Sequence, residues 1–357
     1  MEIREIKSLC DGRWDQVLRI LGPDLSEALD GLHPTPKHVP CPVHGGKDGF
    51  RVFRDVADTG GGICNTCGPR SDGIALLAWV NDWSIGQTLR ELTNYLEGHA
   101  ICAPAPRVRV SQKDMDAENA RIAANLVGTW KRSVAVSDPI AEPVRLHLAR
   151  RGLPTSIYPS VRYHPSLPYY ENKKLVGYFP AMVAMVETVD GQPVTLHRTY
   201  LNADGTKAPV AEPKKSMECP STRSMSGCAI RLAKHGSILG LGEGIETTLS
   251  GMLAMGIPGW ATITAQLMES IVLPPEVTNV IIWADKDVSG RGEQAAKTLI
   301  KRLWSEKRVA AAFLPIDPIP QGKKGIDWND VLIQKGVAAF PTYQQAQEIL
   351  SRKLKAA

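Results

Sequence analysis

Residues 237–245 read Ser-Ile-Leu-Gly-Leu-Gly-Glu-Gly-Ile, a short apolar run that ends in the acidic Glu243. Short apolar runs of this kind are typical of strands buried in a parallel sheet. Acidic side chains follow three such predicted strands: Glu243, Asp285 with Asp287, and Asp327 with Asp330. Carboxylates at the carboxyl ends of parallel strands converge on one edge of the sheet, where they repel one another unless divalent cations neutralise them. The pattern predicts an α/β fold with a Mg²⁺ site for phosphate chemistry.

The three motifs together resemble the Toprim domain, the catalytic core of DnaG-type and phage or plasmid primases, topoisomerases and some nucleases. Its hallmarks are a Glu after one strand and an Asp-x-Asp after a later one, which residues 285–287 match. The resemblance covers about residues 236–337 and implies that Mg²⁺ or Mn²⁺ is held by Glu243, Asp285, Asp287 and Asp327, with Asp330. Many of these primases have another Asp where this chain has Thr247, and Glu246 is the candidate substitute. Taken singly, a Glu-Gly or an Asp-x-Asp motif is usually a solvated turn.

A second set of potential ligands lies near the amino terminus. Cys41-Pro-Val-His44 and Cys64-Asn-Thr-Cys67 are two pairs with the same internal spacing, and 19 residues separate them. A tetrahedral structural Zn²⁺ takes this set of thiolates and imidazole. His38 is a weaker candidate for the fourth ligand, because only His44 completes the spacing of the pair. The alternative interpretation is a set of buried thiols.

The segment between the two ligand pairs is expected to form a half-exposed strand. Residues 49–54, Gly-Phe-Arg-Val-Phe-Arg, alternate apolar and basic side chains. Phe50, Phe53 and the two arginines are suited to bind single-stranded bases by stacking and phosphates by charge. Residues 36–97 as a whole resemble the zinc-binding domain of phage and plasmid primases.

Composition agrees with a protein of the cytoplasm. The chain has 357 residues, 43% of them hydrophobic, which is enough for two or three cores. No apolar run approaches the length of a membrane span, and the first residues lack the features of a signal peptide. Residues 101–240 carry 19 basic and 11 acidic side chains, whereas residues 1–100 carry 10 and 14. A basic segment beside a carboxylate cluster suits a polyanion such as nucleic acid.

These markers divide an α/β multidomain protein into five segments. We expect a zinc ribbon with flanking helices, a Pro-rich linker with a helix, an α+β primase-core subdomain, a Toprim domain with a mainly parallel sheet, and a terminal helix. Their boundaries are predicted at residues 1–100, 101–135, 136–235, 236–340 and 341–357. Strands in the third segment are predicted at 175–179, 181–189 and 195–201.

The third segment resembles the amino-terminal part of the primase polymerase core. In DnaG-type enzymes a Tyr-Leu-Asn segment and the basic residues after it line the nucleotide and template groove, and residues 200–202 here read Tyr-Leu-Asn. The resemblance implies that four basic side chains contact triphosphate or template phosphates: Arg198, Lys207, Lys214 and Lys215. Exposed charges on a loop are the alternative.

The resemblances predict a DNA primase of a phage, plasmid or integrative element, which joins ribonucleoside triphosphates into short primers on single-stranded DNA. The sequence has no Gly-x-x-x-x-Gly-Lys-Ser/Thr phosphate loop, so a separate replicative helicase is the expected partner. A Toprim nuclease and a non-catalytic recombination mediator of the RecR type are the alternatives. A topoisomerase would need a nucleophilic Tyr in a large separate domain.

Overall fold

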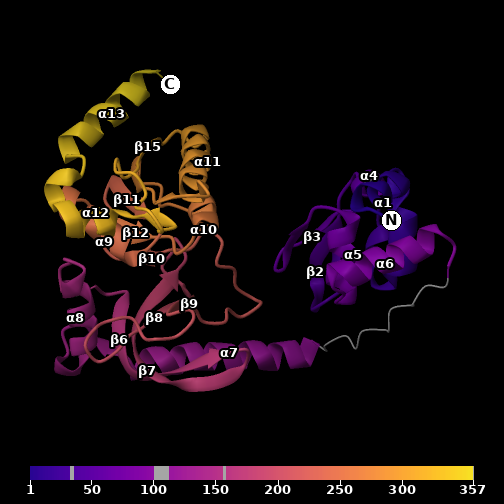
Figure 1. The fold of residues 1–357 in the computed structure, drawn as a ribbon, viewed down its shortest axis with the longest axis horizontal. Helices are drawn as coiled ribbons and strands as arrows, with labels where there is room; N and C mark the ends of the chain where they lie inside the picture. The colour runs from indigo at the N-terminus through magenta and orange to yellow at the C-terminus, as the bar shows by residue number, and fades with distance from the viewer. Residues whose placement is uncertain (33–35, 100–111, 156–157, 357) are drawn as a thin grey trace. The chain divides into compact units, whose positions relative to one another are not determined.

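The computed structural model describes residues 1–32, 36–99, 112–155 and 158–356. Two compact units are present, Met1–Asn119 and Ala120–Ala357 (Figure 1). The predicted Pro-rich linker at 103–110 lies outside the described residues. Among those described, no helix is long and apolar enough to cross a membrane.

The first unit is a small antiparallel sheet with helices before and after it. Before the sheet the chain forms α1 (Ile3–Cys10), α2 (Trp14–Leu21), η1 (Pro23–Leu25) and α3 (Ser26–Asp30). The sheet has the order β1-β2-β3-β4, with β1 (Val39–Cys41), β2 (Gly45–Val52), β3 (Gly62–Cys64) and β4 (Gly68–Arg70). Helix α4 (Val56–Thr59) lies between β2 and β3 in the chain, and α5 (Gly73–Asn81) and α6 (Ile85–Leu96) follow β4 as the predicted flanking helices.

The start of α5 is fixed by packing against Trp14, a buried side chain of this unit's core. Gly73 begins the helix, and a Cβ added there would lie 2.2 Å from the Trp14 ring, so only glycine fits. Asp72 caps the helix, since its carboxylate accepts a hydrogen bond of 2.9 Å from the backbone N–H of Ala75.

An antiparallel five-stranded sheet forms the first half of the second unit. Its order is β5-β6-β7-β8-β9, with β5 (Val134–Ala135), β6 (Val161–Glu171), β7 (Lys174–Glu187), β8 (Pro193–Tyr200) and β9 (Lys214–Ser216). Strand β7 unites two predicted strands, and β6 was not predicted. Helix α7 (Gln112–Arg132) runs along one face of this sheet (Figure 1), where Leu126 joins a core with Tyr169 and Tyr200. The η2 turn (Pro139–Ala141) leads into α8 (Glu142–Arg150).

A second five-stranded sheet follows, in the order β10-β12-β11-β13-β15. Strands β11 (Ile238–Gly242), β12 (Gly259–Ala261), β13 (Asn279–Trp283) and β15 (Val309–Phe313) are parallel, and only the edge strand β10 (Ile230–Arg231) is antiparallel to its neighbour. The prediction of a mainly parallel sheet is confirmed. A separate two-stranded ladder joins β14 (Lys286–Asp287) to β16 (Gly325–Ile326).

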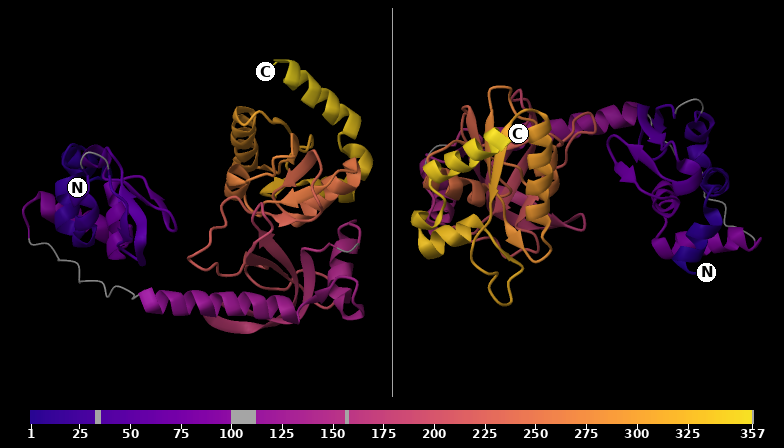
Figure 2. Two further views of the ribbon diagram at one scale, coloured as in Figure 1. Left: turned by 180° about the vertical axis from the view of Figure 1, so that it is seen from behind. Right: turned by 90° about the horizontal axis from the view of Figure 1, so that it is seen from above.

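Helices cover both faces of this parallel sheet (Figure 2). On one face, α11 (Arg291–Ser305) packs Leu299 and Leu303 against the core that contains Leu241 of β11, with α10 (Ala265–Ser270) beside it. On the other face, α9 (Ile245–Met255) and α12 (Trp328–Lys335) pack against Trp283 of β13. The η3 turn (Val337–Ala339) and α13 (Tyr343–Ala356) end the chain. The carboxyl ends of the strands remain open to the cavity described next.

Candidate active site and zinc centre

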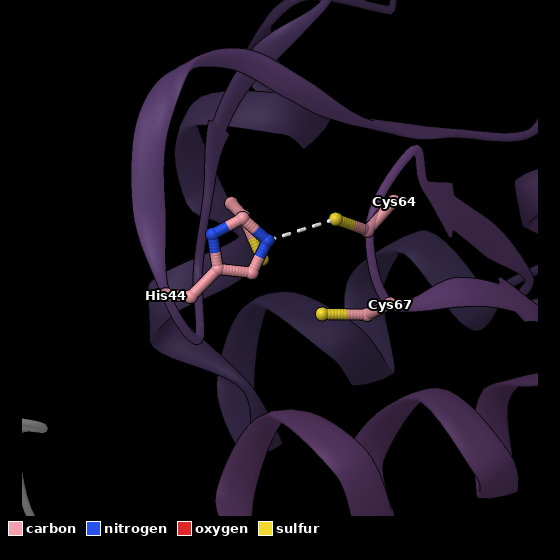
Figure 3. Close-up of side chains that lie close together, drawn as sticks. His44, Cys64 and Cys67 are labelled. Atoms are coloured by element: carbon pink, nitrogen blue, oxygen red, sulfur yellow. Dashed lines mark hydrogen bonds between the residues drawn. The ribbon is translucent and has the colours of Figure 1, made fainter. Parts of the chain in front are cut away.

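The four predicted zinc ligands meet in the first unit. The sulfur atoms of Cys41, Cys64 and Cys67 and a ring nitrogen of His44 all lie within 4.8 Å of one another. His44 Nε2 is 3.2 Å from Cys64 Sγ (Figure 3). Three thiolates and one imidazole in one cluster are the donor set of a tetrahedral structural Zn²⁺. Hydrogen bonding to Cys67 lowers the pKa of Cys41 to about 5, which favours the thiolate that a metal needs.

The side chains between the ligand pairs divide between the core and the surface. Phe50 is only 1% exposed, so it belongs to the core and cannot stack on a base as the alternation suggested. Phe53, Arg51 and Arg54 line an open cavity of about 330 Å³. His38 also lines it, and its Nε2 accepts a hydrogen bond of 3.2 Å from Arg51.

Three of the predicted carboxylates line one cavity of about 360 Å³ in the second unit: Glu243, Asp285 and Asp327. Glu243 follows β11 and Asp285 follows β13, and these strands are parallel neighbours with Gly242 opposite Trp283. Asp327 lies in the same cavity because it follows β16, and β16 pairs with β14, the strand that begins directly after Asp285. The sheet edge therefore gathers acidic groups that are far apart in sequence.

Burial and mutual repulsion raise the pKa of these carboxyl groups. For Asp285, burial first and then the charges of Asp327 and Glu243 raise the pKa to about 8. Burial is also the largest cause that raises the pKa of Glu243 and of Asp327. With this pKa, Asp285 holds a proton near neutral pH unless a cation takes the place of the proton. Their oxygen atoms suit a hard divalent cation such as Mg²⁺.

The two remaining predicted carboxylates are not among the residues that line this cavity, and both accept hydrogen bonds from backbone N–H groups at the start of a helix. Asp287 accepts hydrogen bonds from the backbone N–H groups of Gly292 (3.1 Å) and Arg291 (3.3 Å) in the first turn of α11. Asp330 and Asp327 form a reciprocal capping box at the start of α12, with Asp330 N–H donating to Asp327 at 2.7 Å. Participation of Asp287 or Asp330 in metal binding stays a prediction.

Glu246 lies in the cavity wall and forms a buried ion pair. Its side chain is almost fully buried, Lys214 Nζ lies 2.8 Å from its carboxylate, and His147 Nε2 lies 3.5 Å away. Burial alone would raise the pKa of Glu246, but Lys214 and then His147 lower it well below its usual range. Because Lys214 belongs to β9 and His147 to α8, Glu246 ties both elements to α9. The carboxylate therefore holds the Lys214 ammonium at the cavity.

Thr247 occupies the position where the resembling primases have an acid. Its side chain is buried, and its Oγ1 donates a hydrogen bond of 3.1 Å to Asp285 Oδ1. The hydroxyl group adds no charge to the cavity and fixes the orientation of Asp285.

The adjacent Lys214 and Lys215 point in different directions. Both contribute to the cavity wall, but successive residues of a strand project to opposite faces. Lys214 reaches Glu246, whereas Lys215 Nζ donates a hydrogen bond of 2.8 Å to the Tyr170 carbonyl and lies 4.1 Å from the centre of the Tyr169 ring. Lys214 is thus the better placed of the two to meet a phosphate in the cavity.

Arg198 and Lys207 are not among the lining residues. Arg198 is opposite Lys215 in the sheet and donates hydrogen bonds to the Tyr200 hydroxyl group (2.9 Å) and the Ser216 carbonyl (3.0 Å). Burial, followed by the charge of Lys214, lowers the pKa of Lys207. Contact of either residue with nucleotide or template stays a prediction.

Sequence reasoning passed over two histidines near this cavity. His197 lines it, and burial lowers its pKa to about 4, so the ring is neutral. His197 and Thr199 are two residues apart on β8, so their side chains project to the same face of the sheet, and both line the cavity. This spacing could have indicated His197 from the sequence. Nothing in the sequence indicated that His147 lies near the cavity, because a single histidine in a helix is ordinarily a core residue.

Family comparisons agree with this arrangement. The family described as the zinc-binding domain of primase-helicase matches residues 36–74, and the Toprim domain family matches residues 238–338. Between them, a domain of unknown function, DUF7146, matches residues 120–231. Two of the three predicted resemblances are confirmed: the chain has a primase-type zinc ribbon and a Toprim domain, whose metals are zinc and a divalent Mg²⁺ or Mn²⁺. The resemblance of the third segment to the primase polymerase core stays a prediction. A search of curated proteins gave no match.

Solved primase structures are distantly similar. The primase fragment of the bacteriophage T7 primase-helicase protein is 13% identical, with a TM-score of 0.36, over 85% of this chain and 96% of that chain. The Aquifex aeolicus primase, with zinc-binding and RNA polymerase domains, is 14% identical, with a TM-score of 0.37, over 95% of this chain and 85% of that chain. A DnaG primase catalytic domain bound to single-stranded DNA is 12% identical, with a TM-score of 0.42, over 65% of this chain and 82% of that chain. At such distance no residue roles transfer.

Proposed function

We propose that this chain is a DNA primase that joins ribonucleoside triphosphates into short primers on single-stranded DNA. The observation that carries the proposal is the Toprim cavity, where the carboxylates of Glu243, Asp285 and Asp327 and the ammonium of Lys214 face the same space. Carboxylates for divalent cations beside a cation for phosphate are the groups that nucleotide transfer requires. The primase-type zinc ribbon of the same chain supports the assignment. A separate replicative helicase is the partner expected to supply the single strand.

The residues of the cavity have distinct parts in this proposal. Glu243, Asp285 and Asp327 hold Mg²⁺ or Mn²⁺, which when bound lowers the pKa of a 3′-hydroxyl group and stabilises a leaving pyrophosphate. Lys214 binds an oxygen of the triphosphate, and Glu246 keeps its ammonium in position. The Thr247 hydroxyl orients Asp285. Alignment and charge stabilisation by these preorganised groups are the main sources of rate.

Primer synthesis by the purified protein tests the proposal. With single-stranded DNA, labelled ribonucleotides and Mg²⁺, the wild type should make short oligoribonucleotides, and Asp285→Ala should abolish this activity. The variant should keep its fold, because loss of the carboxylate relieves repulsion from Asp327 and Glu243. Asp317→Ala is a matched control, since Asp317 is an acid outside the cavity lining that pairs with Lys335.

Other results of the same assay would indicate a different function. Mg²⁺-dependent cleavage of the DNA without any primer would indicate a Toprim nuclease that uses the same carboxylates. Binding of DNA with neither reaction, under conditions in which the fold is intact, would indicate a non-catalytic recombination mediator.

A further inference from the structure

The β6–β7 hairpin carries exposed aromatic side chains beyond the cavity. Tyr170 of β6 is 48% exposed and Tyr178 of β7 is 61% exposed, although both residues belong to strands. The hairpin turns at Asn172 and Lys173, whose φ angles are +49° and +64°. A two-residue turn with positive φ angles is typical of a β-hairpin, and the two strands pair from Glu171 and Lys174 onward with a register shift between Tyr169 and Tyr170.

Strand pairing places both tyrosines on the face of the sheet that lines the cavity. Tyr178 lies four residues before Met182 on β7, so their side chains share one face. Met182 pairs with Thr199, and Thr199 pairs with Lys214. Thr199 and Lys214 both line the cavity. The cavity and Tyr178 therefore lie on the same face of the sheet, with the buried Met182 between them.

Tyr170 belongs to the same face. It follows Tyr169, which is fully buried on the opposite face in edge-to-face contact with Tyr200, 4.9 Å between ring centres. Pro168, two residues before Tyr170, pairs with Tyr178. At about 3.3 Å per residue, Tyr178 lies about 13 Å along the strand from Met182, a distance that a few nucleotides of extended single strand cover.

The charges around the tyrosines suit a polyanion. Lys173 and Lys174 are exposed at the turn. The neighbouring acid, Glu171, accepts a hydrogen bond of 3.2 Å from the Ala211 backbone. Single-stranded nucleic acid offers flat bases to aromatic rings and phosphates to lysines at once, whereas an apolar protein surface would leave the lysines unmatched.

We propose that single-stranded nucleic acid binds the hairpin face, defined as Pro168, Tyr170 and Tyr178 with Lys173 and Lys174 at the turn. Bases stack on the two tyrosine rings, phosphates contact the lysines, and the strand continues into the Toprim cavity. The identification of this strand as the priming template rests on the proposed function, but binding to the hairpin face does not.

The test measures the affinity for a short fluorescein-labelled oligothymidylate, without nucleotides or divalent cations. Tyr170→Ala/Tyr178→Ala should weaken binding by about tenfold or more for each stacked base, whereas the Tyr→Phe pair should keep wild-type affinity. Tyr343→Ala is the control, because Tyr343 is an exposed tyrosine (37%) on α13 and should not matter. Lys173→Ala/Lys174→Ala should reduce the salt dependence of binding by about one unit for each lost phosphate contact.

An oligonucleotide of the same length with abasic sites separates stacking from a general structural effect. It should bind wild type and the Tyr→Ala pair equally weakly. Unchanged oligothymidylate affinity in the Tyr→Ala pair, or an equal loss of affinity for both oligonucleotides, would overturn the proposal. This binding assay does not depend on primer synthesis. If the wild type makes no primer but its binding of oligothymidylate depends on the two tyrosines, the proposed function is wrong and the proposal for the hairpin face still holds.

Discussion

Lys214 and Glu246 depend on each other at the residue scale. A buried carboxylate costs several kcal/mol unless a partner compensates its charge, and here the partners are an ammonium at 2.8 Å and an imidazole at 3.5 Å. The pair gives Lys214 a defined position beside Asp285 and Asp327, which a flexible lysine on a loop would not have. We therefore expect Glu246 to act through Lys214 and not as a ligand of the catalytic cation.

Glu246→Gln should raise the KM for nucleotides roughly tenfold, with a smaller change in kcat, because a charge-assisted hydrogen bond contributes about 1.5–3 kcal/mol. The dependence of the rate on Mg²⁺ concentration should stay that of the wild type. Steady-state titrations in nucleotide and in Mg²⁺ measure both effects.

Lys214→Met serves as the partner variant for this prediction. If the two side chains act as a unit, the double variant should be little worse than Lys214→Met alone. A Mg²⁺ requirement that rises in Glu246→Gln, with an unchanged nucleotide KM, would instead make Glu246 a metal ligand.

Asp285 should make stability depend on pH when no divalent cation is bound. Its pKa is about 8 in the folded chain and about 3.9 in an unfolded one. Between these values the folded state binds more protons, so the free energy of unfolding falls as the pH rises from about 4 to about 8. Asp285→Asn lacks this titrating carboxyl group. Its free energy of unfolding should equal that of the wild type below pH 4 and should exceed it by a growing amount as the pH rises to about 8. Urea unfolding at several pH values measures the difference, and parallel pH profiles would contradict the assignment.

The sequence alone predicted that Glu243, Asp285 and Asp327 lie close together, because parallel strands bring their carboxyl ends to one edge of the sheet. The alternation of side chains along a strand also explains why Lys214 and Lys215 diverge, and this could have been anticipated. The approach of His147 to Glu246 could not, since it joins residues 99 apart through the packing of α8 on another subdomain.

At the scale of elements, Trp283 shows how β11, α9 and β13 fit together. Its ring lies between Gly240 of β11 and Gly251 of α9, and an added Cβ would be 2.1 Å from the ring at Gly240 and 2.2 Å at Gly251. The indole N–H donates to the Met255 sulfur at 3.2 Å. Two glycines thus make room for one large side chain beneath the carboxylates of the cavity.

Gly251→Ala should destabilise the second unit, although alanine is the better helix former by about 1 kcal/mol. The clash with Trp283 should cost about 1–3 kcal/mol beyond that gain, as overpacking of a full core does. Thermal unfolding should show a lower Tm. Trp283→Phe should partly rescue the variant, because the smaller ring leaves space.

Gly86→Ala is the matched control for this prediction. Gly86 also lies in a helix, α6, but no atom is within 4 Å of an added Cβ, so this change should not lower stability. Equal effects at both positions would contradict packing against Trp283 as the cause.

Prolines explain why β6 was not predicted and why β7 was predicted as two strands. Strand β6 contains Pro165 and Pro168, which count against a strand because they lack a backbone donor. The structure accommodates them beside a register shift between His164 and Leu167. Pro180 likewise suggested two strands where β7 is continuous. In each case long-range pairing outweighed the local signal.

The whole molecule consists of two units with separate cores. The core of the first unit includes the ligands Cys41 and Cys64, whereas those of the second unit are built from residues 126–350. Small zinc ribbons take most of their folding free energy from the metal. Loss of zinc is therefore expected to unfold one unit and spare the other.

Cys64→Ser tests this independence. The variant should lose bound zinc, and protease should digest residues 36–70, while a fragment that contains the second unit resists. Initiation on single-stranded DNA should disappear, because Arg51, Phe53 and Arg54 of the zinc unit line a cavity suited to bases and phosphates. Extension of a pre-annealed primer should persist in part, since Glu243, Asp285 and Asp327 are untouched. Ser224→Ala, a change outside the zinc site, should behave as wild type. A wild-type protein without zinc on metal analysis, or a Cys64→Ser variant that initiates normally, would show that the zinc unit has no part in starting a primer.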